Sequence, residues 1–133
     1  MIGILIIAHG ALGECLIHCA SHVMGRRPLR LRQIGVTVHD DPELILSHAR
    51  ELAHDLDDGS GILVLSDICG ATPCNIASRL VRPGHIELVS GVSLPMLVRA
   101  LTYREEPLEA VLQKAMVGGV NGVMHLEGGE SSC

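Results

Sequence analysis

Two residues of this sequence follow short apolar segments and carry side chains that can do chemistry together. His9 follows the unbroken apolar run from Ile4 to Ala8, and Asp67 follows the segment 61–66. A carboxylate beside an imidazole accepts a hydrogen bond from one ring nitrogen and leaves the other nitrogen with a free lone pair. Such a nitrogen is a nucleophile. We therefore predict that His9 is a nucleophile and that Asp67 orients its ring, provided that the fold brings them together.

Small residues follow both candidates and would suit an anion. Gly10 comes directly after the histidine, and Gly70, Ala71 and Thr72 come shortly after the aspartate. We expect a helix to begin after each of these loops, with Thr72 as the N-cap of the second helix. Backbone N–H groups at helix starts favour anions, and small residues allow an anion to approach closely. These four residues are predicted to bind phosphate, which together with a nucleophilic histidine describes a phosphohistidine site.

A structural explanation remains open for each residue taken alone. A His-Gly pair after a strand is also typical of an ordinary loop, and an aspartate at a strand end is a common turn former. His18 and His22 are spaced four residues apart, as metal ligands on a helix can be, but no third ligand accompanies them. We therefore expect neither a metal site nor a cofactor.

The pattern of apolar residues predicts the elements that would position the site. Strands are predicted near residues 4–9, 34–38, 61–66 and 85–90, and a short fifth strand at 120–126. Helices are predicted near 12–23, 42–56, 72–82, from about 93, and over 105–116, where Gly118 and Gly119 would end the last one. Alternating strands and helices indicate an α/β fold with a doubly wound, mainly parallel sheet. The common order 2-1-3-4 would place the ends of strands 1 and 3 side by side, and with them His9 and Asp67.

Length and composition limit the classes of protein to which this sequence can belong. The 133 residues are predicted to form a single domain over 1–126, followed by a mobile tail over 127–133. The net charge is −5, and Tyr103 is the only aromatic residue, so a nucleic-acid partner is not expected. No apolar segment is long enough to span a membrane, and no positively charged segment precedes the first apolar run. With five cysteines and no Cys-x-x-Cys spacing, we expect a cytoplasmic protein with reduced thiols.

The order and spacing of three segments resemble a known family over nearly the whole chain. These segments are Ile6–Gly10, Leu65–Asn75 and Val89–Met96, and their most specific part is the motif Asp-x-x-Gly-Ala-Thr-Pro-x-Asn that starts at Asp67. They resemble the mannose-family enzyme IIA of the bacterial phosphoenolpyruvate-dependent sugar phosphotransferase system. This resemblance implies a phosphotransferase in which His9 accepts a phosphoryl group from the histidine-containing phosphocarrier protein and passes it to a IIB protein.

The resemblance also implies an assembly. It implies a homodimer in which the segment from Val120 to Leu126 is exchanged, antiparallel, onto the sheet of the partner. It implies an indirect association with the membrane through a permease formed by IIC and IID subunits. Since the sequence ends soon after the predicted fifth strand, we expect no attached IIB domain. The sugar and the IIB acceptor are left open.

Three alternatives remain at this point. The chain could be a regulatory binding module whose phosphorylation state selects its protein partners, and this would use the same site. A tetrapyrrole metal chelatase also places a His-Gly pair after its first strand, but it would need a second histidine facing His9. A dihydroxyacetone-kinase subunit is a further possibility, although the turn from Thr72 to Asn75 fits the sugar IIA pattern better.

Overall fold

The protein is built around one sheet of four parallel strands. A computed structural model describes residues 1–129. The strands are β1 (Gly3–His9), β2 (Leu31–Val36), β3 (Ile62–Ser66) and β4 (Ile86–Ser90), and they pair in the order β2-β1-β3-β4. All three pairings are parallel. The predicted fold class and strand order are therefore confirmed.

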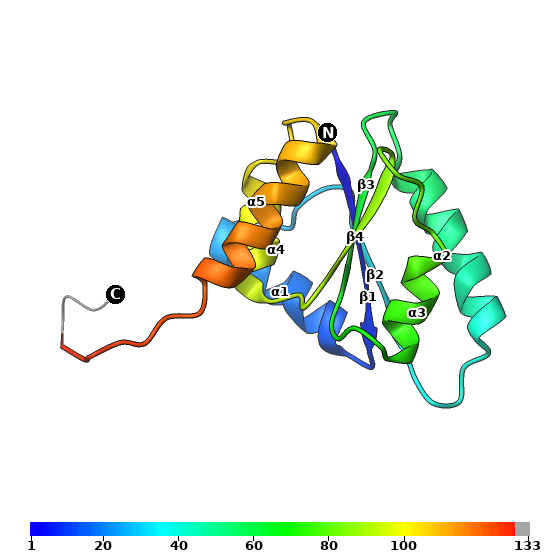
Figure 1. The fold of residues 1–133 in the computed structure, drawn as a ribbon, viewed down its shortest axis with the longest axis horizontal. Coiled ribbons are helices and arrows are strands. Elements are labelled where there is room, and N and C mark those ends of the chain that lie inside the picture. Colours follow the sequence, from blue (N-terminus) through cyan, green and yellow to red (C-terminus); the bar gives the residue numbers. More distant parts are fainter. Residues whose placement is uncertain (130–133) are drawn as a thin grey trace.

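Helices cover both faces of the sheet (Figure 1). The helices within residues 1–129 are α1 (Leu12–Met24), α2 (Pro42–Leu56), α3 (Thr72–Ser78), α4 (Leu94–Thr102) and α5 (Leu108–Asn121). Because side chains of a strand alternate between its faces, β1 contributes Ile4 and Ile6 to the core beneath α1, α4 and α5. It contributes Leu5 and Ile7 to the core beneath α2 and α3. A strand buried on both faces must read as a continuous apolar run, which explains the opening segment of the sequence.

The last helix does not end at the glycine pair, so this prediction was wrong. A Cβ atom on Gly118 would lie 2.7 Å from the Cβ of Arg99, and one on Gly119 would lie 2.8 Å from the Cε of Met96. The glycines therefore allow α5 to lie close against α4, and this packing outweighs their low helix propensity. Consequently α5 extends to Asn121.

The predicted fifth strand is not present in this chain. Residues 120 and 121 are helical, and residues 122–129 belong to no helix or strand. The exchange of segment 120–126 between two chains, and with it the dimer, stays a prediction. Of the predicted tail 127–133, residues 130–133 lie outside the described residues.

Other element ends differ by a few residues. Strand β2 already begins at Leu31, which pairs with Ile4, and it ends at Val36 rather than at Val38. The backbone N–H and hydroxyl of Thr37 both donate to Oδ2 of Asp40, and this turn ends the strand. Helix α3 ends at Ser78 rather than near residue 82, and α5 begins at Leu108 rather than at 105. None of the helices within residues 1–129 combines the length and hydropathy that a membrane-spanning helix requires.

A buried arginine fixes the beginning of β1. Arg104 is 6% exposed, and its guanidinium donates to the carbonyl oxygens of Ile2, Leu29 and Arg30. Burial, together with the charge of Arg30, lowers the pKa of Arg104 to about 10, so the side chain remains charged at neutral pH. The start of β1 is therefore tied to the start of β2, and the opposite end of β1 carries His9.

A glycine in β2 makes room for the loop that follows His9. A Cβ atom on Gly35 would lie 2.1 Å from the carbonyl oxygen of Gly10, which is far inside van der Waals contact. Gly10 itself has a φ of +53° and donates its N–H to the carbonyl oxygen of Val36. The turn after His9 is thus pressed directly against the backbone of β2.

Replacement of Gly35 by alanine is expected to displace this turn. The added methyl group cannot coexist with the carbonyl of Gly10, so we expect Gly35→Ala to lower the free energy of unfolding by about 2 kcal/mol or more. Urea denaturation followed by circular dichroism measures this change. Gly59→Ala serves as a control because no atom lies within 4 Å of its Cβ position, although its φ of +100° also strains alanine. A Gly35→Ala variant no less stable than Gly59→Ala would contradict the close approach.

Candidate active site

His9 and Asp67 meet at the carboxyl ends of neighbouring strands. Ile7 of β1 pairs with Ser66 of β3, so the residues that follow them emerge side by side at the same edge of the sheet. The Nδ1 atom of His9 lies 2.7 Å from Oδ2 of Asp67. The structure thus brings the two side chains together, as the strand order predicts, and their roles as nucleophile and orienting residue stay a prediction.

The Asp67 carboxylate is held by several donors. Its Oδ2 atom also accepts the backbone N–H of His9 at 3.0 Å, and its Oδ1 atom accepts the N–H of Ile68 at 3.0 Å. Partial burial by itself would raise the pKa of this carboxyl, but the backbone and ring hydrogen bonds from His9 and the N–H of Ile68 lower it below its ordinary value. Asp67 is therefore ionised at neutral pH.

The ionised carboxylate determines which ring nitrogen of His9 is free. A carboxylate only accepts hydrogen bonds, so Nδ1 must carry the hydrogen that it donates to Asp67. In the neutral imidazole the lone pair is then on Nε2, for which the described residues provide no hydrogen-bond partner. In this tautomer Nε2 carries the lone pair that a nucleophile needs.

The ring of His9 is open to solvent, whereas the carboxylate of Asp67 is shielded. The side chain of His9 is 54% exposed, whereas that of Asp67 is 13% exposed. An exposed ring on a fixed backbone can be reached by a group carried on another protein. The shielded carboxylate keeps its position because its donors belong to the two strand ends.

The predicted phosphate-binding residues lie in the two loops that flank this pair. Gly10 is exposed directly after His9, and Gly70 is exposed with a φ of +91°. Ala71, rather than Thr72, is the N-cap of α3, so the prediction for Thr72 was wrong by one residue. Thr72 is the first residue of the helix, and its side chain is exposed and makes no hydrogen bond within residues 1–129. The phosphate-binding role of these four residues stays a prediction.

Some residues that shape the site were not singled out from the sequence. Gly35 leaves room for the turn after His9 to pack against β2. The N–H of Val92 donates to the carbonyl oxygen of Ser66 at 2.9 Å, and this hydrogen bond connects the ends of β3 and β4. Ile68 is 58% exposed beside Asp67, and Val38 is 94% exposed in the loop after β2. For Gly35, the sequence offers one signal, which is a glycine inside a predicted strand.

The two histidines spaced like metal ligands, His18 and His22, lie outside the site. His18 and His22 are exposed on α1. Within residues 1–129 no group of three or more His, Cys, Asp or Glu side chains is arranged to hold a metal ion.

Comparison with known proteins identifies the family. The family model described as the PTS system fructose IIA component matches residues 3–116. The chain is 30% identical over 129 residues to the PTS system mannose-specific EIIAB component of Escherichia coli K12, a match that covers 95% of this chain and 40% of that protein. It is also 34% identical over 65 residues to the putative phosphotransferase enzyme IIA component YadI of the same organism, covering 48% of this chain and 44% of that protein. The chain thus spans about two fifths of the length of the mannose-specific EIIAB component, and the match to YadI is confined to about half of this chain.

Solved structures share the fold. Phosphotransferase system component EIIA from Streptococcus agalactiae superimposes with a TM-score of 0.83 at 25% identity, covering 94% of this chain and 97% of that one. The mannose/sorbose specific IIA subunit from Enterococcus faecalis superimposes with a TM-score of 0.85 at 19% identity and covers 97% of both chains, which supports the fold alone. The family match over residues 3–116 means that this chain belongs to the mannose-type enzyme IIA family of the sugar phosphotransferase system.

Proposed function

We propose that this protein is a phosphohistidine relay in sugar uptake. In this proposal Nε2 of His9 receives a phosphoryl group from the histidine-containing phosphocarrier protein and passes it to a IIB protein. The observation that carries the proposal is the hydrogen bond of 2.7 Å between Nδ1 of His9 and the ionised Asp67, because it directs the lone pair of an exposed histidine away from the protein. Family membership and the 30% identity to a mannose-specific EIIAB component support the same role.

The proposed step transfers one phosphoryl group between two imidazole rings. The lone pair on Nε2 attacks the phosphorus of the phosphohistidine on the donor protein, and the electron pair of the breaking N–P bond returns to the donor ring. Because Nδ1 of His9 keeps its hydrogen, the phosphorylated ring acquires positive charge, which the carboxylate of Asp67 stabilises. Handing the group to a IIB protein is the same step in reverse. The protein contributes position and electrostatics rather than a change in its own covalent structure.

The flanking loops would complete the phosphate site. Gly10, Gly70, Ala71 and Thr72 all lie in the loops that follow His9 and Asp67, at the same edge of the sheet. The backbone N–H groups of Gly70, Ala71 and Thr72 and the free hydroxyl of Thr72 are suitable donors for phosphate oxygens, whereas the N–H of Gly10 already donates to Val36. Both glycines have a positive φ, which L side chains rarely adopt, and the space beside each is open.

The surroundings of His9 suit protein partners. Leu12 at the start of α1, Val38 after β2 and Ile68 after β3 are all exposed at the edge that carries His9. Exposed apolar side chains around a polar reactive group are typical of a docking surface for another protein. We assign this edge to the phosphocarrier and the IIB protein, and any association with the membrane would be indirect, through the permease that the IIB protein serves.

The proposed dimer concerns another part of the molecule. Strand β4 is the last strand of the sheet order, so one side of it has no strand partner within residues 1–129. Met116, Val120 and Val123 are exposed beside it and line one hollow with Val89 of this strand. An unpaired strand edge with apolar neighbours is suited to pairing with a segment from a second chain.

Removal of the proposed nucleophile is expected to abolish phosphorylation. His9→Ala, incubated with phosphoenolpyruvate, enzyme I and the phosphocarrier protein, should gain no acid-labile phosphate in mass spectrometry at mildly alkaline pH. His18→Ala is the matched control, since it removes an exposed histidine of α1 outside the site, and it should be phosphorylated like the unaltered protein. Acid-labile phosphate on the His9→Ala variant would refute the assignment.

Replacement of Asp67 by asparagine is expected to slow transfer without preventing folding. An amide can donate a hydrogen to Nδ1, which would favour the tautomer whose Nε2 is protonated and not nucleophilic. We expect the rate of phosphorylation to fall by at least about tenfold, as quenched-flow measurements would show. Asp55→Asn, on the exposed face of α2, is the control. An Asp67→Asn variant that transfers at the unaltered rate would remove the orienting role of Asp67.

The lowered pKa of Asp67 predicts how stability depends on pH. A carboxyl whose pKa is lower in the folded state stabilises the fold fully above its unfolded pKa of about 3.9 and loses this effect as the pH falls through the folded value. The difference in unfolding free energy between the unaltered protein and Asp67→Asn should therefore be constant above about pH 5 and shrink below about pH 4. Urea titrations from pH 3 to 7 measure it. A difference that does not change over this range would mean that the hydrogen bonds do not favour the ionised carboxylate.

A further inference from the structure

One face of helix α1 presents thiols and imidazoles to solvent. The side chains of α1 that can ligate a metal ion and are exposed are Cys15, His18, Cys19 and His22. Successive residues of a helix are rotated by about 100° around its axis, so these four side chains fall within an arc of about 100°. The residues that α1 buries against the core lie on the opposite side of the helix, and they are Gly13, Ile17 and Ala20. The packing of α1 therefore directs all four potential ligands outward together.

The two thiols on this face are spaced to hold one ion between them. Cys15 and Cys19 are four residues apart in a continuous helix, so their Cβ atoms are about 5–6 Å apart. A disulfide needs Cβ atoms about 3.5–4.5 Å apart, so the helix keeps this pair from closing one. Two thiolates that share an ion through bonds of about 2.3 Å have their sulfur atoms at most about 4.6 Å apart, which this spacing allows. Both thiols are free and exposed, and they are thus available to a metal ion.

The small number of ligands indicates which kind of ion fits. Within residues 1–129 no three His, Cys, Asp or Glu side chains are arranged to hold a metal ion together. A structural zinc site takes four ligands, so the described part of one chain does not supply it. Thiolates prefer soft cations, and among these Cu(I) is stable with two ligands in a linear arrangement. A pair of thiols without a third ligand therefore favours Cu(I) over Zn(II).

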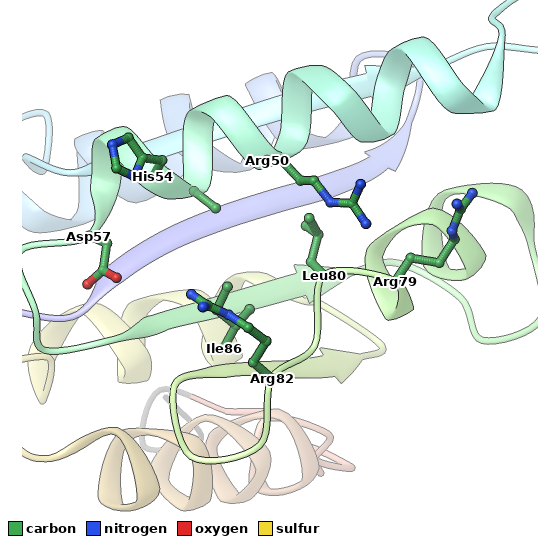
Figure 2. A pocket seen from close by; sticks show the side chains of 8 residues that line it. Arg50, His54, Asp57, Arg79, Leu80, Arg82 and Ile86 are labelled. Atoms are coloured by element: carbon green, nitrogen blue, oxygen red, sulfur yellow. The ribbon is translucent and has the colours of Figure 1, made fainter.

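The cavity shown in Figure 2, of about 440 Å³, also contains a histidine and a carboxylate but suits a cation less well. The side chains of His54 and Asp57 line it together with Arg50, Arg79 and Arg82. The guanidinium of Arg82 is directed toward the end with His54 and Asp57, and that of Arg50 toward the other end, so both ends carry positive charge (Figure 2). Helix α1, by contrast, carries no lysine or arginine.

We propose that Cys15 and Cys19 bind one Cu(I) ion as a linear dithiolate. On binding, each thiol releases its proton to solvent and its sulfur donates an electron pair to the ion, so that nothing is oxidised or reduced. The imidazoles of His18 and His22 are not ligands in this arrangement. The site lies on the exposed face of α1, and it does not depend on the proposed function of His9.

Competition for Cu(I) with bicinchoninate, a chelator that is coloured when it holds the ion, tests the proposal on the full chain. The titration excludes oxygen and uses a reductant that is not a thiol. We expect each chain to withdraw one ion from the chelator without a change in its elution volume in gel filtration. Cys15→Ser/Cys19→Ser should weaken binding by at least about a hundredfold, since loss of an outer-shell partner alone typically costs about ten- to a hundredfold. The matched control Cys69→Ser/Cys133→Ser also removes two thiols and should bind like the unaltered protein.

The remaining outcomes overturn the proposal. Equal binding by the two double variants would refute the site, and one ion per two chains in a larger species would place the ion between copies. His18→Ala/His22→Ala should retain full affinity, and a loss of affinity would make the imidazoles ligands. Zn(II) bound as tightly as Cu(I), as an indicator dye for zinc would show, would refute the class of ion. Circular dichroism of each variant verifies that the helices form, which is expected because the side chains replaced on α1 are exposed.

Discussion

One carboxylate oxygen joins the two central strands at the point where the chemistry is proposed. Oδ2 of Asp67 accepts both the backbone N–H of His9 and the hydrogen on its ring. The first bond fixes the strand ends relative to each other, and the second fixes the orientation and tautomer of the imidazole. Neither could form if β1 and β3 were not neighbours in a parallel sheet, because only then do both chain ends leave the sheet at the same edge.

This arrangement keeps the ring of His9 fixed in position and exposed to solvent at the same time. A relay histidine must be reached by two different proteins, so it has to be exposed, and exposed side chains ordinarily sample several rotamers. Here the ring is 54% exposed yet bonded at Nδ1 to a carboxylate that is itself 13% exposed and bonded to backbone N–H groups. The backbone beneath is equally constrained, since Gly35 allows the turn at Gly10 to rest directly on β2. The position of Nε2 is thus set by the fold rather than by the partner.

The sequence was sufficient for the sheet and for the central pair of residues. Continuous apolar runs identify buried parallel strands, and the common strand order then brings His9 and Asp67 together without any contact being known. The failures at three glycines have a common physical cause. Local propensity predicts a helix end at Gly118 and Gly119 and assigns no role to Gly35, whereas all three glycines admit a neighbouring segment that is distant in the sequence. Similarly, the sequence around Arg104 does not reveal that its side chain donates to buried carbonyl groups. The sequence around Arg50 and Arg82 does not reveal that both line the same cavity.

The central claim concerns one atom, and nuclear magnetic resonance can test it directly. Protein labelled with 15N in its histidine rings, once phosphorylated through the phosphocarrier, should show a phosphorus–nitrogen coupling at one ring nitrogen of His9. If Asp67 holds Nδ1 as described, the phosphoryl group must be on Nε2, with Nδ1 still carrying its hydrogen. A phosphoryl group on Nδ1 would contradict this account, because that nitrogen could then no longer donate to Asp67.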